Sequence, residues 1–144
     1  AGGSGYMFRT ATVQDFSAVT GACLLVKTSV WDEVKGLDEA FAVAFNDVDF
    51  CLRVRDAGYR IAWTPYAQLT HYESKSRGGD EKDPVKAARF AAEQQRLYTV
   101  HGKENILDDP YYNPNLTRDR EDFSESDDLR GLKEGRITVR YRGA

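Results

Sequence analysis

The pattern of apolar and polar positions divides the chain into short elements separated by polar or glycine-containing turns. Residues 18–26, AVTGACLLV, are an apolar run of strand length, and Gly21 within it is the kind of glycine that marks a bulge or a close approach by a ligand. This run predicts a buried strand. Thr28 or Ser29 then caps a short predicted helix, which Gly36 ends.

An amphipathic pattern follows in the stretch FNDVDFCLRVRDAG. Asn46 is a residue type that caps helices, and Gly58 is a stop signal. Side chains that fall on one side at helical spacing are Val48, Cys51, Leu52 and Arg55. The stretch therefore predicts a helix with two acids, Asp47 and Asp49, in its first turn.

Two extended segments are predicted next. Residues 59–63 form the first, and residues 66–72 form the second, with His71 near its end. After a polar loop at residues 74–80, Asp83-Pro84 begins the longest predicted helix. Gly102 is its stop signal.

The character of the sequence changes beyond that glycine. Residues 109–115 are rich in turn formers, and residues 119–128 hold six acids against one arginine. These features predict an irregular arm. Residues 136–142 alternate apolar with polar or basic side chains, which predicts a terminal strand with one basic face.

Composition fits one globular domain, because 144 residues with 41% hydrophobic side chains are enough to bury a core. The order of strands and helices predicts an α/β fold. We expect a flexible leader at residues 1–16, the main part at residues 17–104, and an arm with a terminal strand at residues 105–144. Cys23 and Cys51 lack CxxC spacing and lie in apolar runs, which predicts buried free thiols.

Charge and hydropathy narrow the partners and the location. The net charge of −3 gives no general argument for nucleic acid or an anionic membrane as partner. No apolar run approaches the roughly 18 residues of a membrane span, and no signal peptide begins the sequence. We therefore expect a cytoplasmic protein.

The residues alone leave the chemistry of the two acids open. Three roles stay open for Asp47 and Asp49, which are a helix cap, a metal site and a catalytic base. An acid in a first helical turn is most often a cap. His71 on a strand is more often packed or at the surface than a metal ligand. An exposed basic loop such as residues 74–77 is usually only solvated.

Three segments nevertheless resemble, in this order, the second half of a family 2 glycosyltransferase with a GT-A fold. They are VTGACLLVKTSVWDEVKGLDEAF, FNDVDFCLRVRDAGYRIAWTPYAQLTHYESKSRG and DPYYNPNLTRDREDFS, and they cover most of residues 17–124. The middle segment is the most specific. The resemblance is to bacterial enzymes that build surface polysaccharides, such as O-antigen or rhamnan, and it does not extend to residues 125–144.

The resemblance implies roles for the acids of the middle segment. Family members transfer a sugar from a nucleotide-diphosphate donor to an acceptor hydroxyl with inversion, so a base must take the acceptor proton. That base lies in an acidic pair that corresponds to Asn46-Asp47, which gives Asp47 the role, with Asn46 in place of the more usual acid. Asp49 either binds the acceptor or completes a capping box with Asn46. Gly21 and Ala22 would let the sugar or acceptor approach the backbone.

The resemblance also implies a donor side. His71 matches a histidine that helps hold a divalent cation, Mn²⁺ or Mg²⁺, on the donor phosphates. Lys75, Ser76 and Arg77 would contact the diphosphate, with Arg77 as the preferred contact. The partners implied are a nucleotide-sugar donor and a glycan acceptor, at the inner face of the membrane or in the cytoplasm.

The nucleotide-binding first half of a GT-A fold has no room before Ala18. We therefore expect a partial GT-A fold, a mixed sheet with flanking helices, that belongs to a longer enzyme and is inactive alone. The alternative is a non-catalytic module that binds carbohydrate or protein. A metal-dependent hydrolase is a third class, which one histidine supports only thinly. An exposed sheet edge would also favour self-association.

Overall fold

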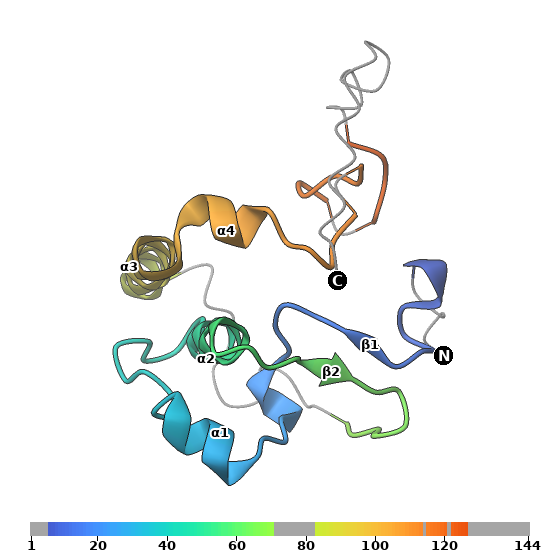
Figure 1. Cartoon of the computed structure of the whole chain (residues 1–144). Helices are drawn as coiled ribbons and strands as arrows, with labels where there is room; N and C mark the ends of the chain where they lie inside the picture. The colour runs from blue at the N-terminus through green and yellow to red at the C-terminus, as the bar shows by residue number, and fades with distance from the viewer. Residues whose placement is uncertain (1–5, 71–82, 114, 121, 127–144) are drawn as a thin grey trace. The chain divides into compact units, whose positions relative to one another are not determined.

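The computed structural model describes residues 6–70, 83–113, 115–120 and 122–126 (Figure 1). They divide into two compact units, the first ending at Tyr111 and the second beginning at Tyr112, seven residues later than the predicted start of the arm. The elements in chain order are η1 (Tyr6–Phe8), β1 (Gln14–Asp15), η2 (Gly21–Cys23), α1 (Thr28–Glu33), α2 (Asn46–Asp56), β2 (Ala62–Trp63), α3 (Pro84–His101) and α4 (Lys103–Leu107). The predicted α/β class is confirmed.

The sheet in the described residues is one antiparallel pair, which Figure 1 shows as two adjacent arrows. Gln14 pairs with Trp63 and Asp15 with Ala62, and the Phe16 N–H extends the pairing with a 3.0 Å bond to the carbonyl of Ile61. The strand predicted at residues 59–63 is thus confirmed in part. Its partner strand, Gln14–Asp15, lies within residues 1–16, the range predicted as a flexible leader.

The prediction of a strand at residues 18–26 is wrong. Gly21–Cys23 form the short helix η2, capped by Thr20, whose side chain accepts a bond from the Ala22 N–H. The Gly21 N–H bonds to the side chain of Asp47 and not to a neighbouring strand. Four apolar residues of the segment, Ala18, Val19, Leu24 and Val26, still pack against the core, whereas Leu25 is exposed. The hydropathy of the segment therefore reported partial burial and not strand geometry.

Helices α1 and α2 are confirmed, with a change at the start of each. Lys27 and Phe45 are the capping residues, and Asn46 is the first residue of α2 and not its cap. Phe45 has a left-handed backbone conformation, with φ of 63°. Gly58, the predicted stop signal, lies at φ of 89° just beyond α2, where glycine is favoured.

Helix α3 begins and ends where local signals place it. The side chain of Asp83 accepts a 2.9 Å bond from the Val85 N–H, Pro84 opens the helix, and Gly102 caps its end at φ of 79°. The extended piece predicted at residues 66–72 is not a strand over residues 66–70, and its last two residues lie outside the described part.

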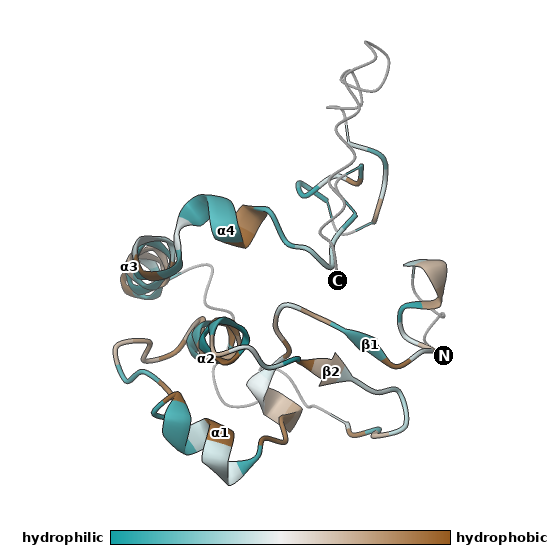
Figure 2. Cartoon of the chain, in the orientation of Figure 1, coloured by the Kyte–Doolittle hydropathy of each residue, from teal (hydrophilic) through white to brown (hydrophobic). Residues whose placement is uncertain are grey.

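The core of the first unit lies between α1, α2 and the start of β2. Its buried members are Val30, Phe50, Cys51, Val54 and Ile61. Along α2, hydrophobic and hydrophilic residues share the helix, as the mixed colouring in Figure 2 shows. Among the described residues, no helix has the length and apolar character needed to cross a membrane.

The second unit contains more order than the irregular arm that the sequence predicts. An isolated antiparallel bridge joins Leu116 to Glu125, and the Thr117 N–H bonds to the carbonyl of Ser124 at 2.9 Å. The Tyr112 hydroxyl donates to the carbonyl of Thr117 at 2.6 Å. The strand predicted at residues 136–142 lies outside the described residues.

Candidate functional site

Asp47 joins the first turn of α2 to η2. Its Oδ2 accepts a 2.9 Å hydrogen bond from the Gly21 N–H, and its Oδ1 accepts one of 2.9 Å from the Val48 N–H. The side chain of Asn46 accepts a 2.8 Å bond from the Asp47 N–H. Three residues predicted for the site, Gly21, Asn46 and Asp47, therefore lie together.

The Asp47 carboxylate keeps capacity for a further ligand. An ionised carboxylate offers about four lone-pair positions, and the two backbone N–H groups occupy one on each oxygen. The side chain is half-buried, and Gly21 beside it is exposed. The carboxylate can therefore accept a proton or hydrogen bond from a hydroxyl group that approaches from solvent.

Gly21 packs closely against this carboxylate. A Cβ built at position 21 would lie 3.4 Å from the Asp47 Cβ and 3.7 Å from its Oδ2. The absence of a side chain therefore leaves one flank of the carboxylate uncovered. Ala22, the next predicted contact, is exposed in η2 and donates its N–H to the Thr20 hydroxyl.

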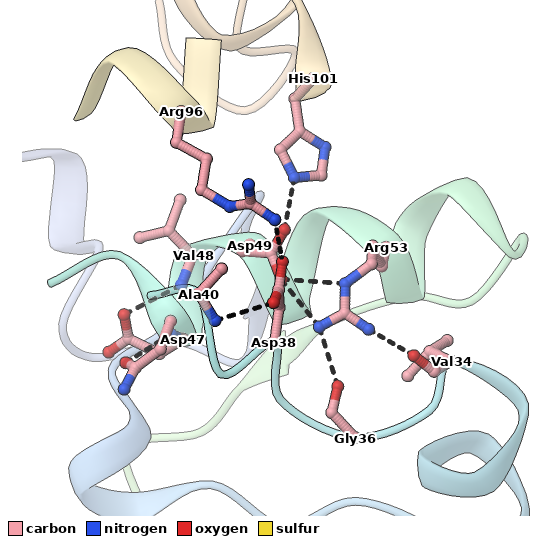
Figure 3. A network of polar contacts seen from close by, with 11 residues as sticks. Val34, Gly36, Asp38, Ala40, Asp47, Val48, Asp49, Arg53, Arg96 and His101 are labelled. Atoms are coloured by element: carbon pink, nitrogen blue, oxygen red, sulfur yellow. Dashed lines mark hydrogen bonds and ion pairs between the residues drawn. The ribbon is translucent and has the colours of Figure 1, made fainter. Parts of the chain in front are cut away.

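Asp49 lies at the centre of a buried polar network, shown in Figure 3. Its Oδ2 accepts bonds of 2.9 and 2.7 Å from Nε and Nη2 of Arg53, and its Oδ1 lies 2.8 Å from Nε2 of His101. Arg53 also donates to the carbonyls of Val34 and Gly36. Arg53 thus links α2 to the residues that follow α1, and Asp49 links α2 to the last residue of α3.

This environment favours the structural role of the two that the sequence leaves open for Asp49. The residue is 1% exposed, and both carboxylate oxygens have partners. A capping box would instead have turned one oxygen back to the Asn46 N–H. An acceptor would have to displace Arg53 or His101 to reach the carboxylate.

Helix α3 contacts the loop before α2 at several points. We call residues 37–45 the entry loop. Glu93 is 5% exposed and accepts a 2.6 Å bond from the Ala44 N–H, and the Phe45 and Phe90 rings pack with their centroids 4.9 Å apart. One side of α3 therefore covers the chain that leads into Asp47.

A further contact anchors the start of the entry loop. Arg96 donates a 2.9 Å bond to Asp38, as Figure 3 shows, and the Ala40 N–H donates to the other oxygen of the same carboxylate. The Ala40 hydrogen bond and the Arg96 guanidinium lower the pKa of Asp38. Asp38 is therefore a charged anchor at neutral pH.

The donor-side residues predicted from the sequence, His71, Lys75, Ser76 and Arg77, lie outside the described residues. Within the described part, no three side chains of His, Cys, Asp or Glu come together as a metal site would require. The described residues therefore do not by themselves fit a divalent cation. The metal and diphosphate roles stay predictions.

The sequence reasoning missed Arg53, Glu93 and His101. The spacing of four residues between Asp49 and Arg53 on a helix was a usable signal for an ion pair. Glu93 and His101 carried no such signal, because their partners lie 49 and 52 residues away in the chain.

Comparison with known proteins identifies a family that this chain matches. The family described as "Glycosyltransferase like family 2" matches residues 5–101. The chain is 48% identical over 124 residues to the uncharacterized protein y4gI of Sinorhizobium fredii, an overlap that covers 83% of this chain and 13% of the relative. No solved structure matches the chain.

Two further relatives have informative names. The O-antigen biosynthesis protein RfbC of Myxococcus xanthus is 32% identical over 75% of this chain and 8% of its own length. The N-acetylglucosaminyl-diphospho-decaprenol L-rhamnosyltransferase of Mycobacterium tuberculosis is 34% identical over 56% of this chain and 24% of its own length. The chain thus spans less than a quarter of each of these relatives. Since the family match covers more than half of the chain and includes α2 with Asp47, this chain belongs to glycosyltransferase family 2.

Proposed function

We propose that this chain supplies the acceptor side of an inverting glycosyltransferase and that Asp47 is its general base. The observation that carries the proposal is the Asp47 carboxylate, which two backbone N–H groups hold in place while it stays half-exposed beside Gly21. A base has to be fixed in direction and still open to its substrate. Family membership supports the reaction class.

The proposed reaction is a single displacement. An oxygen of Asp47 accepts the proton of the acceptor hydroxyl as the hydroxyl oxygen bonds to the anomeric carbon of the donor sugar. The bond from that carbon to the diphosphate breaks on the opposite face, and the nucleoside diphosphate leaves with the electron pair. Attack from the opposite face inverts the configuration at the anomeric carbon.

The substrates proposed are a nucleotide-diphosphate sugar and the hydroxyl of a growing surface glycan. The names of two relatives refer to rhamnosyl transfer. They are the mycobacterial enzyme and the rhamnosyltransferase WbbL of Escherichia coli. An activated rhamnose is therefore the first donor to test. We also propose that the enzyme works in the cytoplasm, at the inner face of the membrane where lipid-linked acceptors lie.

The donor side of the proposal rests on the family resemblance alone. His71 would help hold a divalent cation, and Lys75, Ser76 and Arg77 would contact the diphosphate. When bound, such a cation would neutralise charge on the leaving diphosphate. No step of the reaction at Asp47 depends on these residues.

The 144-residue chain alone is proposed to be inactive and to self-associate. Apolar side chains at its surface support association, including Leu25 at 98% and Tyr66 at 84% exposure. Light scattering at micromolar concentration tests this, because a monodisperse monomer would contradict it.

A transfer assay separates the proposed enzyme from a binding module. The complete enzyme is incubated with nucleotide sugars and a lipid-linked glycan, and nucleoside diphosphate release is compared with and without acceptor. Release that depends on the acceptor supports glycosyl transfer. Glycan binding without any release, across a panel that includes dTDP-rhamnose, would instead identify a carbohydrate-binding module.

A further inference from the structure

Phe45, two residues before Asp47, has a backbone conformation that phenylalanine rarely adopts. Its φ of 63° and ψ of 4° lie in the left-handed region, where a side chain crowds the backbone. Such a residue persists only where its surroundings hold it. The direction in which the chain enters α2, and with it the position of Asp47, therefore depends on what holds Phe45.

Helix α3 supplies those contacts on both sides of Phe45. The Phe90 ring packs on the Phe45 ring itself, and Glu93 binds the N–H of Ala44 immediately before it. Further along, His101 binds Asp49 in the first turn of α2. Contacts from a single helix thus bracket Asp47 three residues before it and two residues after it.

Of these three α3 residues, Glu93 has the fewest alternative bonding partners. Its side chain is 6% exposed, and its Oε2 lies 2.6 Å from the Ala44 nitrogen. Within the described part of the chain, the nearest cationic atom is Nε of Arg89, 4.0 Å from Oε1, which is an ion-pair distance and too long for a hydrogen bond. A buried carboxylate is unfavourable without partners, so the bond to Ala44 fixes the entry loop firmly.

We propose that Glu93 is a positioning residue for Asp47, assisted by Phe90. It holds the Ala44 N–H, keeps Phe45 in its left-handed conformation, and so directs the first turn of α2 toward Gly21. Its importance for turnover rests on the proposed function of Asp47, but its effect on the geometry of the first turn does not. Loss of Glu93 should therefore loosen the Gly21–Asp47 bond and lower kcat while the KM for the donor stays nearly constant.

Three variants of the 144-residue chain test the geometry by amide hydrogen exchange measured by NMR. Glu93→Leu removes the acceptor at similar volume, Glu93→Gln keeps an oxygen that can accept from Ala44, and Glu104→Leu changes an exposed glutamate on α4 as the control. Loss of a bond to a charged acceptor should raise exchange at the Ala44 and Gly21 amides by about ten- to hundredfold. The amide of Val54, a buried residue inside α2, reports global opening, and we expect it to change much less.

The expected pattern is faster exchange at Gly21 in Glu93→Leu, restoration in Glu93→Gln, and no change in Glu104→Leu. If Glu93→Leu does not fold, Phe90→Leu replaces it, because Phe90 is 50% exposed and tolerates truncation better. Unchanged exchange at Gly21, or an equal rise at Gly21 and Val54, would overturn the proposal.

The same substitutions in the complete enzyme test turnover. A fall in kcat for Glu93→Leu, with the donor KM unchanged and recovery in Glu93→Gln, supports positioning, and an unchanged kcat refutes it. If the parent enzyme transfers no sugar, the proposed function fails, and hydrogen exchange still decides whether Glu93 positions the turn.

Discussion

Substitution of Asp49 by alanine should destabilise the chain strongly. The change removes the acceptor for two nitrogens of Arg53 and for Nε2 of His101. The side chains of His101 and Arg53, which are 6% and 26% exposed, would then lose the carboxylate that their nitrogens contact. The remaining bonds of Arg53 to two backbone carbonyls would hold its charge there without a counterion.

The magnitude follows from this burial. Removal of one partner of a buried ion pair costs about 3–5 kcal/mol, because the other charge is left uncompensated. A domain has a total stability of about 5–15 kcal/mol, so the loss is a large share of it. With a urea m-value of about 2 kcal/mol/M, the midpoint of unfolding should fall by about 1.5–2.5 M.

Urea unfolding followed by circular dichroism provides the assay, and Asp15→Ala provides a matched control. Arg60 lies 2.8 Å from Asp15, nearly the distance between Arg53 and Asp49, but Arg60 is 78% exposed. We expect Asp15→Ala to shift the midpoint little, since exposed pairs add little stability. Equal shifts for the two variants would show that the Asp49 network is not a buried support.

Three further predictions concern thiols, glycines and pH. Cys23 is exposed, whereas Cys51 is buried, and burial raises the pKa of the Cys51 thiol. A disulfide reagent such as DTNB should therefore modify Cys23 quickly and Cys51 only in urea. Fast modification of both thiols would contradict this. Gly36→Ala should lower the melting temperature more than Gly58→Ala. Both glycines have positive φ, but only at position 36 would the added Cβ lie 2.8 Å from an atom of the Trp31 indole. Equal losses of melting temperature would refute the clash. The lowered pKa of Asp38 means that its stabilisation is complete above the ordinary value of 3.8 and is lost as pH falls through the lower folded value. The urea midpoints of Asp38→Asn and the parent chain should therefore converge below about pH 4, and a constant gap would contradict the assignment.

Local signals predicted the elements that local contacts determine. Asp83 and Gly102 cap α3 through bonds within a few residues, so the sequence was sufficient to place both ends. The segment at residues 18–26 depends on a distant contact instead. Its Gly21 N–H bonds to Asp47, 26 residues later, and this bond favours a short helix over the strand that its composition predicts.

The candidate site divides in the same way. The resemblance and the helix signals placed Asp47 in a first turn, and the structure brings Gly21 and Asn46 to it. The structural role of Asp49 was not decidable from sequence, because it depends on His101 at the far end of another helix. The buried partners of a carboxylate are set by tertiary packing, which sequence spacing does not report.

Turnover of Asp47→Asn in the complete enzyme tests the proposed base most directly. The substitution keeps the size of the side chain and an oxygen that can accept the Gly21 or Val48 N–H, and it removes the ability to take a proton. At saturating donor and acceptor, kcat should fall by about 10²–10⁴-fold, with donor affinity within a few-fold of the parent. Glu104→Gln, a change of charge at an exposed site on α4, should leave kcat unchanged. Retention of more than about a tenth of the parent turnover by Asp47→Asn would contradict its role as general base.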